Sequence, residues 1–451
     1  MLLDPRLLLG LVVAVAIVCR LAGAGDALSA DEGYSWLVAS ASGAGDFLDR
    51  LALYEYTPPL FYLLLAPLPL DDEVWIRLPA LVAGVAAVPV LYLAVRRLLG
   101  TRAGLVAALG LAVAPYHVSF SNYARAFTLA TLFLLLALWA AAELARGGSR
   151  RWWFLYCLAA VAALYSQYYA ALFLLPLAAA LAATRTRPLG EVALLAGAPF
   201  LALLPWIGQI DRSRELAGVT KVDPTYPGPS PGALRDVVAP LFFGEHGSAG
   251  AAAGRWLQLL IVLALLAAAV VLLRRRARVE QGARLALWLF GVTAGGTLAL
   301  HGVVAAVGPD VFESRYLTAL IPLSAALLAA GVDSLPWRAA APATAAVLVL
   351  LGVAVVVQRS GRELEPDYAE VAAVVDQARP RIVLTNSAVV AYYLRERQAR
   401  LDRPFNLGPG EEARARRPYV VVDDSRIGTE PRPGPGRRIQ VGPLVVRPVR
   451  R

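Results

Sequence analysis

The sequence predicts an all-α protein that crosses a membrane about eleven times and ends in a small soluble α/β domain. Hydrophobic residues make up 58% of the 451 residues and the mean hydropathy is +0.59, whereas soluble proteins have about 45–50% apolar residues. This excess is concentrated in blocks that approach the roughly 20 residues needed to cross about 30 Å of hydrocarbon. Arginine-rich segments recur between alternate blocks, and the last part of the chain returns to an ordinary soluble composition.

Apolar blocks separated by charged or Pro- and Gly-rich segments are the expected transmembrane helices. The first block, Leu7 to Leu21, could be a signal peptide, but only Arg6 precedes it and no good cleavage site follows, which favours an uncleaved helix. The expected spans lie at about 7–22, 77–99, 102–119, 124–145, 152–167, 169–184, 190–207, 255–273, 284–307, 316–335 and 339–357.

The charges of the connecting loops predict the orientation. By the positive-inside rule, the arginine-rich loops are cytoplasmic. The N-terminus is then inside, and the segments 23–76, 208–254 and 308–314 and the C-terminal segment are outside. The arginines of the inner loops are Arg96, Arg97, Arg102, Arg146, Arg150, Arg151, Arg185, Arg187, Arg274, Arg275, Arg276, Arg278 and Arg338.

Two of the outer segments are too long for simple connections. Segment 23–76 contains short apolar stretches at 34–41 and 59–68 that are interrupted by prolines, and we expect them to be helices lying in the outer interface. Segment 208–254 is rich in Pro and Gly and is expected to be a flap over a site. Both belong to a transmembrane domain that covers 1–357.

Residues 358–451 are expected to fold as a soluble extracytoplasmic α/β domain. No nucleotide-binding glycine pattern follows the first expected strand. The domain could bind an acceptor or simply cover the membrane domain. Its expected elements are a strand at Ile382–Asn386, a helix at Ser387–Arg397, and strands at Tyr419–Asp423 and Val441–Val446.

The net charge of +10 comes almost entirely from arginine, because Lys221 is the single lysine. These arginines lie beside apolar blocks, which indicates membrane topology rather than a nucleic-acid partner. Cys19 and Cys157 both fall inside expected spans, so they are interpreted as packed thiols rather than as a disulfide or a metal pair.

Two adjacent carboxylates, Asp31 and Glu32, come soon after the first span. Ionisable groups at a membrane edge are costly and tend to be functional. They could also begin a solvated helix, whose dipole favours acidic residues there. The same segment continues through Leu53-Tyr54-Glu55-Tyr56-Thr57-Pro58-Pro59-Leu60-Phe61-Tyr62.

Arg125 and Arg315 stand at the outer starts of two spans, against the charge rule that the other flanking arginines obey. Each could extend to lipid headgroups. Because both lie at the membrane level expected for Asp31, they could instead form one anion site, since guanidinium pairs well with phosphate.

These motifs resemble the polytopic glycosyltransferases that use polyprenyl-phosphate sugars, which have the GT-C fold. The chain is most similar to the branch of the aminoarabinose transferases and protein O-mannosyltransferases, over about 1–357. The order of the motifs carries this resemblance more than any one of them. They are Asp31-Glu32, Pro58-Pro59-Leu60-Phe61-Tyr62, Ala124-Arg125 and Arg315-Tyr316-Leu317.

The resemblance implies an inverting transferase of the plasma membrane that acts at the outer face, with Asp31 as general base and Glu32 orienting Asp31 or the acceptor. It implies that Arg125 and Arg315 bind the donor phosphate. Thr57 stands where the aminoarabinose enzyme has a lysine, so the resemblance does not extend to that donor contact. The residues expected to line the substrate site are Tyr34, Glu55, Tyr56, Pro58, Tyr62, Tyr123, Gln167, Tyr168, Tyr169 and Tyr316.

The expected partners are a polyprenyl-phosphate-linked sugar, membrane lipid and a lipid, glycan or protein acceptor, with no nucleic acid. A divalent metal held by Asp31, Glu32 and a phosphate is possible, although the three histidines show no ligand spacing. A transporter or flippase is the alternative function, but there is no clear internal repeat and the ionisable residues gather at one face. A relative that only binds polyprenyl phosphate is a third alternative.

Overall fold

The computed structural model of the chain divides into two compact units. The first unit comprises residues 1–24, 56–64 and 77–361, and the second comprises 25–55, 65–76 and 362–451. Most of the expected first outer segment is thus grouped with the C-terminal segment, and the expected domain boundary near residue 358 stays a prediction. The described residues are 4–55, 57–217, 230–243, 252–307, 313–335, 340–360, 371, 375, 382–385, 388–393, 399–401, 419–424, 439–441 and 444–449.

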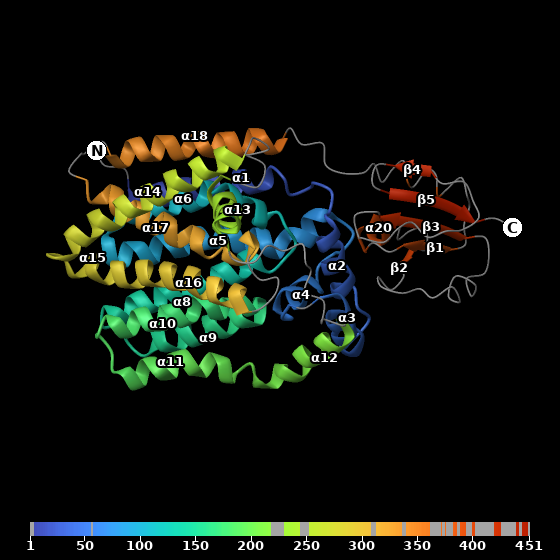
Figure 1. Ribbon diagram of the computed structural model, residues 1–451, viewed down its shortest axis with the longest axis horizontal. Helices are drawn as coiled ribbons and strands as arrows, with labels where there is room; N and C mark the ends of the chain where they lie inside the picture. Colours follow the sequence, from blue (N-terminus) through green and yellow to red (C-terminus); the bar gives the residue numbers. More distant parts are fainter. Residues whose placement is uncertain are drawn as a thin grey trace. The chain divides into compact units, whose positions relative to one another are not determined.

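The first unit is a bundle of helices (Figure 1). Neighbouring helices in the bundle run side by side, as α8 does with α9, and α10 with α16. Its main helices are α1 (Pro5–Leu21), α5 (Glu73–Leu99), α6 (Thr101–Val113), α7 (Pro115–Ser121), α8 (Phe127–Ala145), α9 (Arg151–Ser166), α10 (Ala171–Ala183), α11 (Leu189–Leu201), α12 (Ile207–Ala217), α13 (Pro231–Phe243), α14 (Ala252–Ala277), α15 (Gln281–Ala286), α16 (Thr293–Val307), α17 (Leu320–Asp333) and α18 (Ala340–Ser360).

Short irregular turns interrupt this bundle. A single π-helical turn, η3 (Leu287–Val292), joins α15 to α16, and such turns often occur at functional sites. Three 3₁₀ turns lie at helix starts or ends: η1 (Tyr168–Ala170), η2 (Leu204–Trp206) and η4 (Ser314–Leu317). A further short helix, α4 (Leu60–Leu65), follows the Pro58-Pro59 pair.

The protein is a multi-pass membrane protein. Among the described residues, five helices are long and apolar enough to cross a bilayer, or six if a bent pair counts as one span. Large apolar side chains on their outer faces are exposed, as Leu194 is at 66%, which suits contact with lipid tails. The five are Glu73–Leu99, Phe127–Ala145, Leu189–Ser213, Trp256–Ala277 and Gln281–Ala306. The expected total of eleven spans stays a prediction.

The bent pair is α6 and α7, which corrects the expected straight span at 102–119. The two helices meet at 60°. Pro115 is the first residue of α7, and Ala114 before it has extended backbone, because a residue that precedes proline avoids the helical region. The bend ends α6 early and gives α7 a direction of its own.

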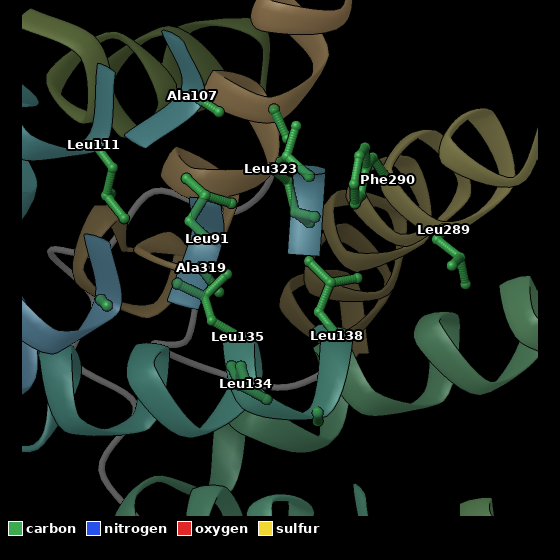
Figure 2. Packing of buried hydrophobic residues seen from close by; sticks show 14 of the residues in the cluster. Leu91, Ala107, Leu111, Leu134, Leu135, Leu138, Leu289, Phe290, Ala319 and Leu323 are labelled. Atoms are coloured by element: carbon green, nitrogen blue, oxygen red, sulfur yellow. The ribbon is translucent and has the colours of Figure 1, made fainter. Parts of the chain in front are cut away.

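The core of the first unit is made of small and branched apolar side chains. Leu91 of α5, Leu111 of α6 and Leu135 of α8 are fully buried. Figure 2 shows these side chains close together, with Phe290 of η3 and Leu323 of α17 beside them. Many alanines in this core allow the helices to approach closely, as is usual in membrane bundles.

The second unit contains helices α2 (Ala30–Ala39) and α3 (Ala44–Tyr54), the short helix α20 (Ala388–Tyr393) and a sheet. The strands have the order β2-β1-β3-β5-β4 (Figure 1). The first three are parallel, and β5 pairs antiparallel with both β3 and β4. The strands are β1 (Ile382–Thr385), β2 (Ala399–Leu401), β3 (Tyr419–Asp424), β4 (Ile439–Val441) and β5 (Leu444–Val449).

Candidate functional site

The Asp31-Glu32 pair lies in the first turn of α2, in the second unit. Ser29 caps this helix by accepting a hydrogen bond from the backbone N–H of Glu32 (3.4 Å). The Glu32 carboxylate in turn accepts one from the backbone N–H of Ser29 (2.9 Å). This reciprocal arrangement is a capping box. Glu32 is buried, at 1% exposure, while Asp31 next to it is half-buried.

In the first unit, a polar cavity surrounds Arg315 of η4. It has a volume of about 290 Å³ and is lined by residues of α7, the turn after α7, and η4. We call it the Arg315 cavity. Its described lining includes one cation, one carboxylate, four hydroxyl groups and three aromatic rings. These residues are Tyr116, Ser119, Phe120, Tyr123, Glu313, Ser314 and Arg315.

Within this cavity, Arg315 forms an ion pair with Glu313. Arg315 Nε donates a hydrogen bond to the Glu313 carboxylate, and both side chains are partly exposed. The guanidinium carbon also lies 5.8 Å from the centre of the Tyr316 ring, within the range of a cation–π contact. Tyr116 of α7 donates a hydrogen bond to the Ser314 hydroxyl, which joins α7 to η4.

A row of aromatic rings connects several of the expected site residues. Tyr123 lies against Phe127 at 6.4 Å between ring centres, and Phe127 against Tyr316 at 6.3 Å. Tyr316 then contacts Tyr169 at 4.1 Å, and Tyr169 stacks on His301 at 6.1 Å. Tyr123, Tyr169 and Tyr316 were expected in one site, and the fold brings them into one row.

A small pocket of about 20 Å³ lies along the same row. Arg315 borders both this pocket and the Arg315 cavity. Gln167, which precedes η1, is buried here together with His301 of α16. Gln167, Tyr169, Arg315 and Tyr316 are therefore gathered by the fold, although they come from separate parts of the chain.

Arg125 lies in the turn between α7 and α8, where its backbone N–H donates to the Tyr123 carbonyl (2.6 Å). Its side chain is half-buried. The described lining of the Arg315 cavity does not include it. The structure thus connects Arg315, but not Arg125, with this cavity, and the joint phosphate site of the two arginines stays a prediction.

The other expected residues are spread over both units. In the second unit, Tyr34 stacks on Tyr54 at 6.0 Å, and Glu55 is buried at the end of α3. In the first unit, the Tyr62 hydroxyl is 2.7 Å from that of Thr57. Pro58 is buried, Tyr168 accepts a hydrogen bond from Trp206 (2.9 Å), and Tyr56 lies outside the described residues.

Glu313 and Tyr116 are residues that the sequence interpretation left out of the site. Glu313 lies two residues before the Arg315-Tyr316-Leu317 motif, and Tyr116 lies in the expected span at 102–119. The sequence signal for Glu313 was its negative charge, two residues before the positive charge of Arg315. Adjacent residues in an extended segment need not contact each other, so this ion pair could not be read from the order of residues.

A buried arginine fixes α7, which carries part of the cavity wall. Arg20 at the end of α1 is 1% exposed. Its guanidinium donates to Ser121 Oγ (3.0 Å) and lies 2.8 Å from His117 Nδ1, both on α7. It also donates to the carbonyls of Ala16 and Ala112, at 2.9 Å each. An arginine buried among membrane helices needs such partners, and here they connect α1, α6 and α7.

A second large cavity, of about 230 Å³, is almost entirely apolar. It is lined by α6, α13, α14, α17 and α18 and by Pro115 at the α6–α7 bend. Pro115 is adjacent to Tyr116, which lines the Arg315 cavity. Helix α13 contacts both α7 and η4. A polar cavity and an apolar cavity are therefore bordered by consecutive residues of one helix.

Over the described part of the chain, no three His, Cys, Asp or Glu side chains gather where they could hold a metal ion.

Residues 56–208 match the family model of dolichyl-phosphate-mannose-protein mannosyltransferases. This match starts at the Pro58-Pro59 motif and includes Arg125, Gln167 and Tyr169. Together with the structural matches below, it confirms the resemblance to GT-C glycosyltransferases expected from the sequence. No curated protein sequence matches the chain.

Solved structures of the same fold cover nearly the whole chain. The structure of ArnT from Cupriavidus metallidurans in the apo state has a TM-score of 0.66 at 15% identity, over 97% of both chains. The same protein bound to undecaprenyl phosphate has a TM-score of 0.64 at 15% identity, again over 97% of both. An oligosaccharyltransferase from Archaeoglobus fulgidus in complex with Zn and sulfate has a TM-score of 0.55 at 13% identity, over 93% of this chain and 68% of that chain. At sequence identities of 13–15%, these structural matches show a shared fold.

Proposed function

We propose that this protein is a membrane glycosyltransferase that moves a sugar from a polyprenyl-phosphate donor to an acceptor hydroxyl. The observation that carries the proposal is the Arg315 cavity, in which a cation and aromatic rings lie next to an apolar cavity along α7. A lipid-linked sugar combines the same three chemistries: an anionic phosphate, a sugar ring and an apolar chain. The fold it shares with ArnT, which has been solved with undecaprenyl phosphate bound, supports this reading.

In the proposed reaction, the acceptor oxygen forms a bond with the anomeric carbon of the sugar. The bond between that carbon and the donor phosphate oxygen breaks, and the configuration inverts. The acceptor proton moves to the Asp31 carboxylate, which acts as general base. The bonding electrons leave with the polyprenyl phosphate, whose growing negative charge is stabilised by Arg315 and Arg125. Glu32 keeps the start of α2 in place through its capping bond to Ser29.

We further propose that the reaction takes place on the outer face of the plasma membrane. The loop charges support a cytoplasmic N-terminus, about eleven spans and an extracytoplasmic α/β domain at the C-terminus. The acceptor is a lipid, a glycan or a protein, and 208–254 forms a flap over the site. Helices α12 and α13 occupy parts of that segment, while 218–229 and 244–251 lie outside the described residues.

The phosphate part of the proposal is tested by a double-mutant cycle on affinity for farnesyl phosphate in detergent. Each single Arg→Ala change at 125 and 315 should weaken binding by about 2–3 kcal/mol, as expected for hydrogen bonds to charged groups. The double change should cost less than the sum if both bind one phosphate. Arg→Lys should not restore affinity, because an ammonium cannot reproduce the two-pronged guanidinium contact.

The matched control is Arg97→Ala, which removes an arginine that pairs with Glu143 at helix ends proposed to lie in the cytoplasm. If both Arg→Lys variants bind farnesyl phosphate as tightly as the unmodified chain, the two arginines are interface anchors. If the unmodified chain does not bind farnesyl phosphate, the transporter alternative gains support.

A further inference from the structure

Helix α20 of the C-terminal segment packs directly on α2, the helix that carries Asp31. Both helices belong to the second unit. Residues Ala388 to Tyr392 of α20 are buried, with Val389 and Val390 at 0% and Tyr392 at 1% exposure. Helix α20 also contacts strands β1 and β2. It therefore connects α2 to the sheet.

The closest part of this contact is at Gly33, two residues after Asp31. A Cβ atom at this position would lie 2.7 Å from Val389 Cα and 2.8 Å from the Ala388 carbonyl carbon, and it would also collide with the Val389 backbone nitrogen. These are backbone atoms, so a side-chain rotation cannot make room. Only glycine allows the two helices to approach this closely.

Two contacts flank Gly33 on either side. The backbone N–H of Leu28 donates to the Tyr393 hydroxyl (2.8 Å), one residue before the Ser29 cap. Trp36 packs edge-on against Tyr392 at 5.5 Å between ring centres. The α2 side of the interface thus spans residues 28–36, and Asp31 lies within it.

The surroundings of Tyr393 favour the neutral form of its hydroxyl. Burial raises the pKa of its hydroxyl well above the ordinary value, and the nearby Glu73 carboxylate adds to this rise.

We propose that α20 is a positioning element for the base: the C-terminal segment sets the place of Asp31 through the Gly33 contact, and transfer depends on it. The proposal rests on the function proposed above. It gives the C-terminal segment a role in the reaction that differs from binding an acceptor and from simply covering the membrane domain. Because a displacement of about 1 Å can cost about 10²-fold in rate, even a small separation of α2 from α20 should be visible in turnover.

The test compares Gly33→Ala with Gly45→Ala in the full-length chain. Gly45 lies in the first turn of the neighbouring helix α3, and a Cβ there meets nothing within 4 Å. Three quantities are measured: the sugar-modified product in cells, normalised to the amount of protein in the membrane, the affinity for farnesyl phosphate, and hydrogen exchange of the amides at 30–39.

Gly33→Ala should lower the product by about 10²-fold with farnesyl phosphate affinity unchanged, and should speed exchange at 30–39. Gly45→Ala should change none of the three. Tyr393→Phe removes the hydroxyl that accepts the Leu28 N–H and that also hydrogen-bonds to Glu73. This variant should lower the product about five- to tenfold, and it decides the question if the Gly33→Ala protein does not reach the membrane in sufficient amount.

The proposal would be overturned if both Gly33→Ala and Tyr393→Phe gave as much sugar-modified product as the unmodified chain. A parallel loss of farnesyl phosphate affinity would also overturn it, because the substitutions would then disturb the whole site rather than the base. A chain that binds no farnesyl phosphate, or that keeps its product in Asp31→Asn, would instead contradict the proposed function. Hydrogen exchange at 30–39 would still report on the α2–α20 contact in that case.

Discussion

At the scale of single residues, the ion pair between Glu313 and Arg315 affects how an anion enters the Arg315 cavity. In the ligand-free chain, the Glu313 carboxylate accepts a hydrogen bond from Arg315. A donor phosphate that binds Arg315 has to replace this carboxylate or share the guanidinium with it. Glu313 would therefore compete with the donor, and its charge would also repel a phosphate.

Glu313→Gln is expected to raise the affinity for farnesyl phosphate. The amide keeps the shape of the side chain but removes the negative charge, and the gain should be severalfold because the pair is partly exposed to water. Titration calorimetry in detergent measures it. Glu143→Gln, which breaks the ion pair with Arg97 between the ends of α8 and α5, is the control and should leave affinity unchanged. Weaker binding in Glu313→Gln would mean that Glu313 helps to hold the ligand.

The site could be predicted from the sequence only in part. Motif order pointed to Arg315, Tyr316, Tyr123 and Tyr169, and the fold gathers these four residues. The capping role of Glu32 was visible in the Ser29-Asp31-Glu32 spacing, but an acidic pair after a membrane span directed attention to chemistry instead. Whether a nearby charge such as Glu313 pairs with its neighbour depends on local backbone geometry, which residue order does not determine.

At the scale of elements, the bend between α6 and α7 shapes the Arg315 cavity. Helix α7 carries Tyr116, Ser119 and Phe120 of the cavity wall. Its place is set by the hydrogen bonds of Arg20 to Ser121 and to the end of α6. The expected single span at 102–119 missed this bend because hydropathy continues through Pro115, whereas proline interrupts the hydrogen bonding of the helix.

Gly84→Ala should destabilise the protein at this junction. A Cβ on this residue of α5 would collide with the Ser121 hydroxyl and lie 3.1 Å from Arg20 Nε. Ser121 cannot turn away without losing its bonds to Arg20 and to the His117 carbonyl. Overpacking of this kind costs about 1–3 kcal/mol, which should appear as a lower midpoint of thermal unfolding in detergent.

Gly295→Ala provides the control for this prediction. Gly295 also lies inside a helix of the bundle, but a Cβ there meets nothing within 4 Å. Alanine favours helix more than glycine does, so this variant should be as stable as the unmodified chain or slightly more stable. Equal midpoints for the two variants would show that the Arg20 cluster is less tightly packed than described.

At the scale of the whole molecule, ion pairs join helix ends that the loop charges place in the cytoplasm. Arg97 in the last turn of α5 pairs with Glu143 at the end of α8 (2.7 Å). Arg276 at the end of α14 pairs with Asp333 at the end of α17 (2.6 Å). The arginine-rich loops were read as signals of orientation, and in the fold some of these arginines also connect neighbouring helices.

Single cysteines test the orientation in intact cells. Cysteines that replace Ser248 and Ser425 should react with a membrane-impermeant thiol reagent, because both positions are proposed to lie outside. Val279, which is 82% exposed after α14, is proposed to lie inside, so Val279→Cys should react only after the cells are opened. The unaltered chain, whose own Cys19 is buried, gives the background. If Val279→Cys is labelled in intact cells and Ser425→Cys is protected, the orientation is opposite to the one proposed.

Much of the helical bundle was predictable because membrane spans have a strong and simple signal. The grouping of segment 25–55 with the C-terminal segment was not, since the contact between Gly33 and Val389 joins residues that are far apart in sequence. Strands β2 and β4, of three residues each, were too short to be recognised from alternation of side chains.

The central claim is that the chain transfers a sugar with Asp31 as the base. The most direct test is mass spectrometry of envelope glycans and glycoproteins from cells without the chain, complemented with the unmodified protein, with Asp31→Asn, or with Asp49→Asn as an exposed carboxylate control on α3. The unmodified protein and Asp49→Asn should restore the same sugar-modified product. Asp31→Asn should lower it by about 10²–10⁴-fold, the usual contribution of a general base, while it still binds farnesyl phosphate. Full product from Asp31→Asn would contradict the account.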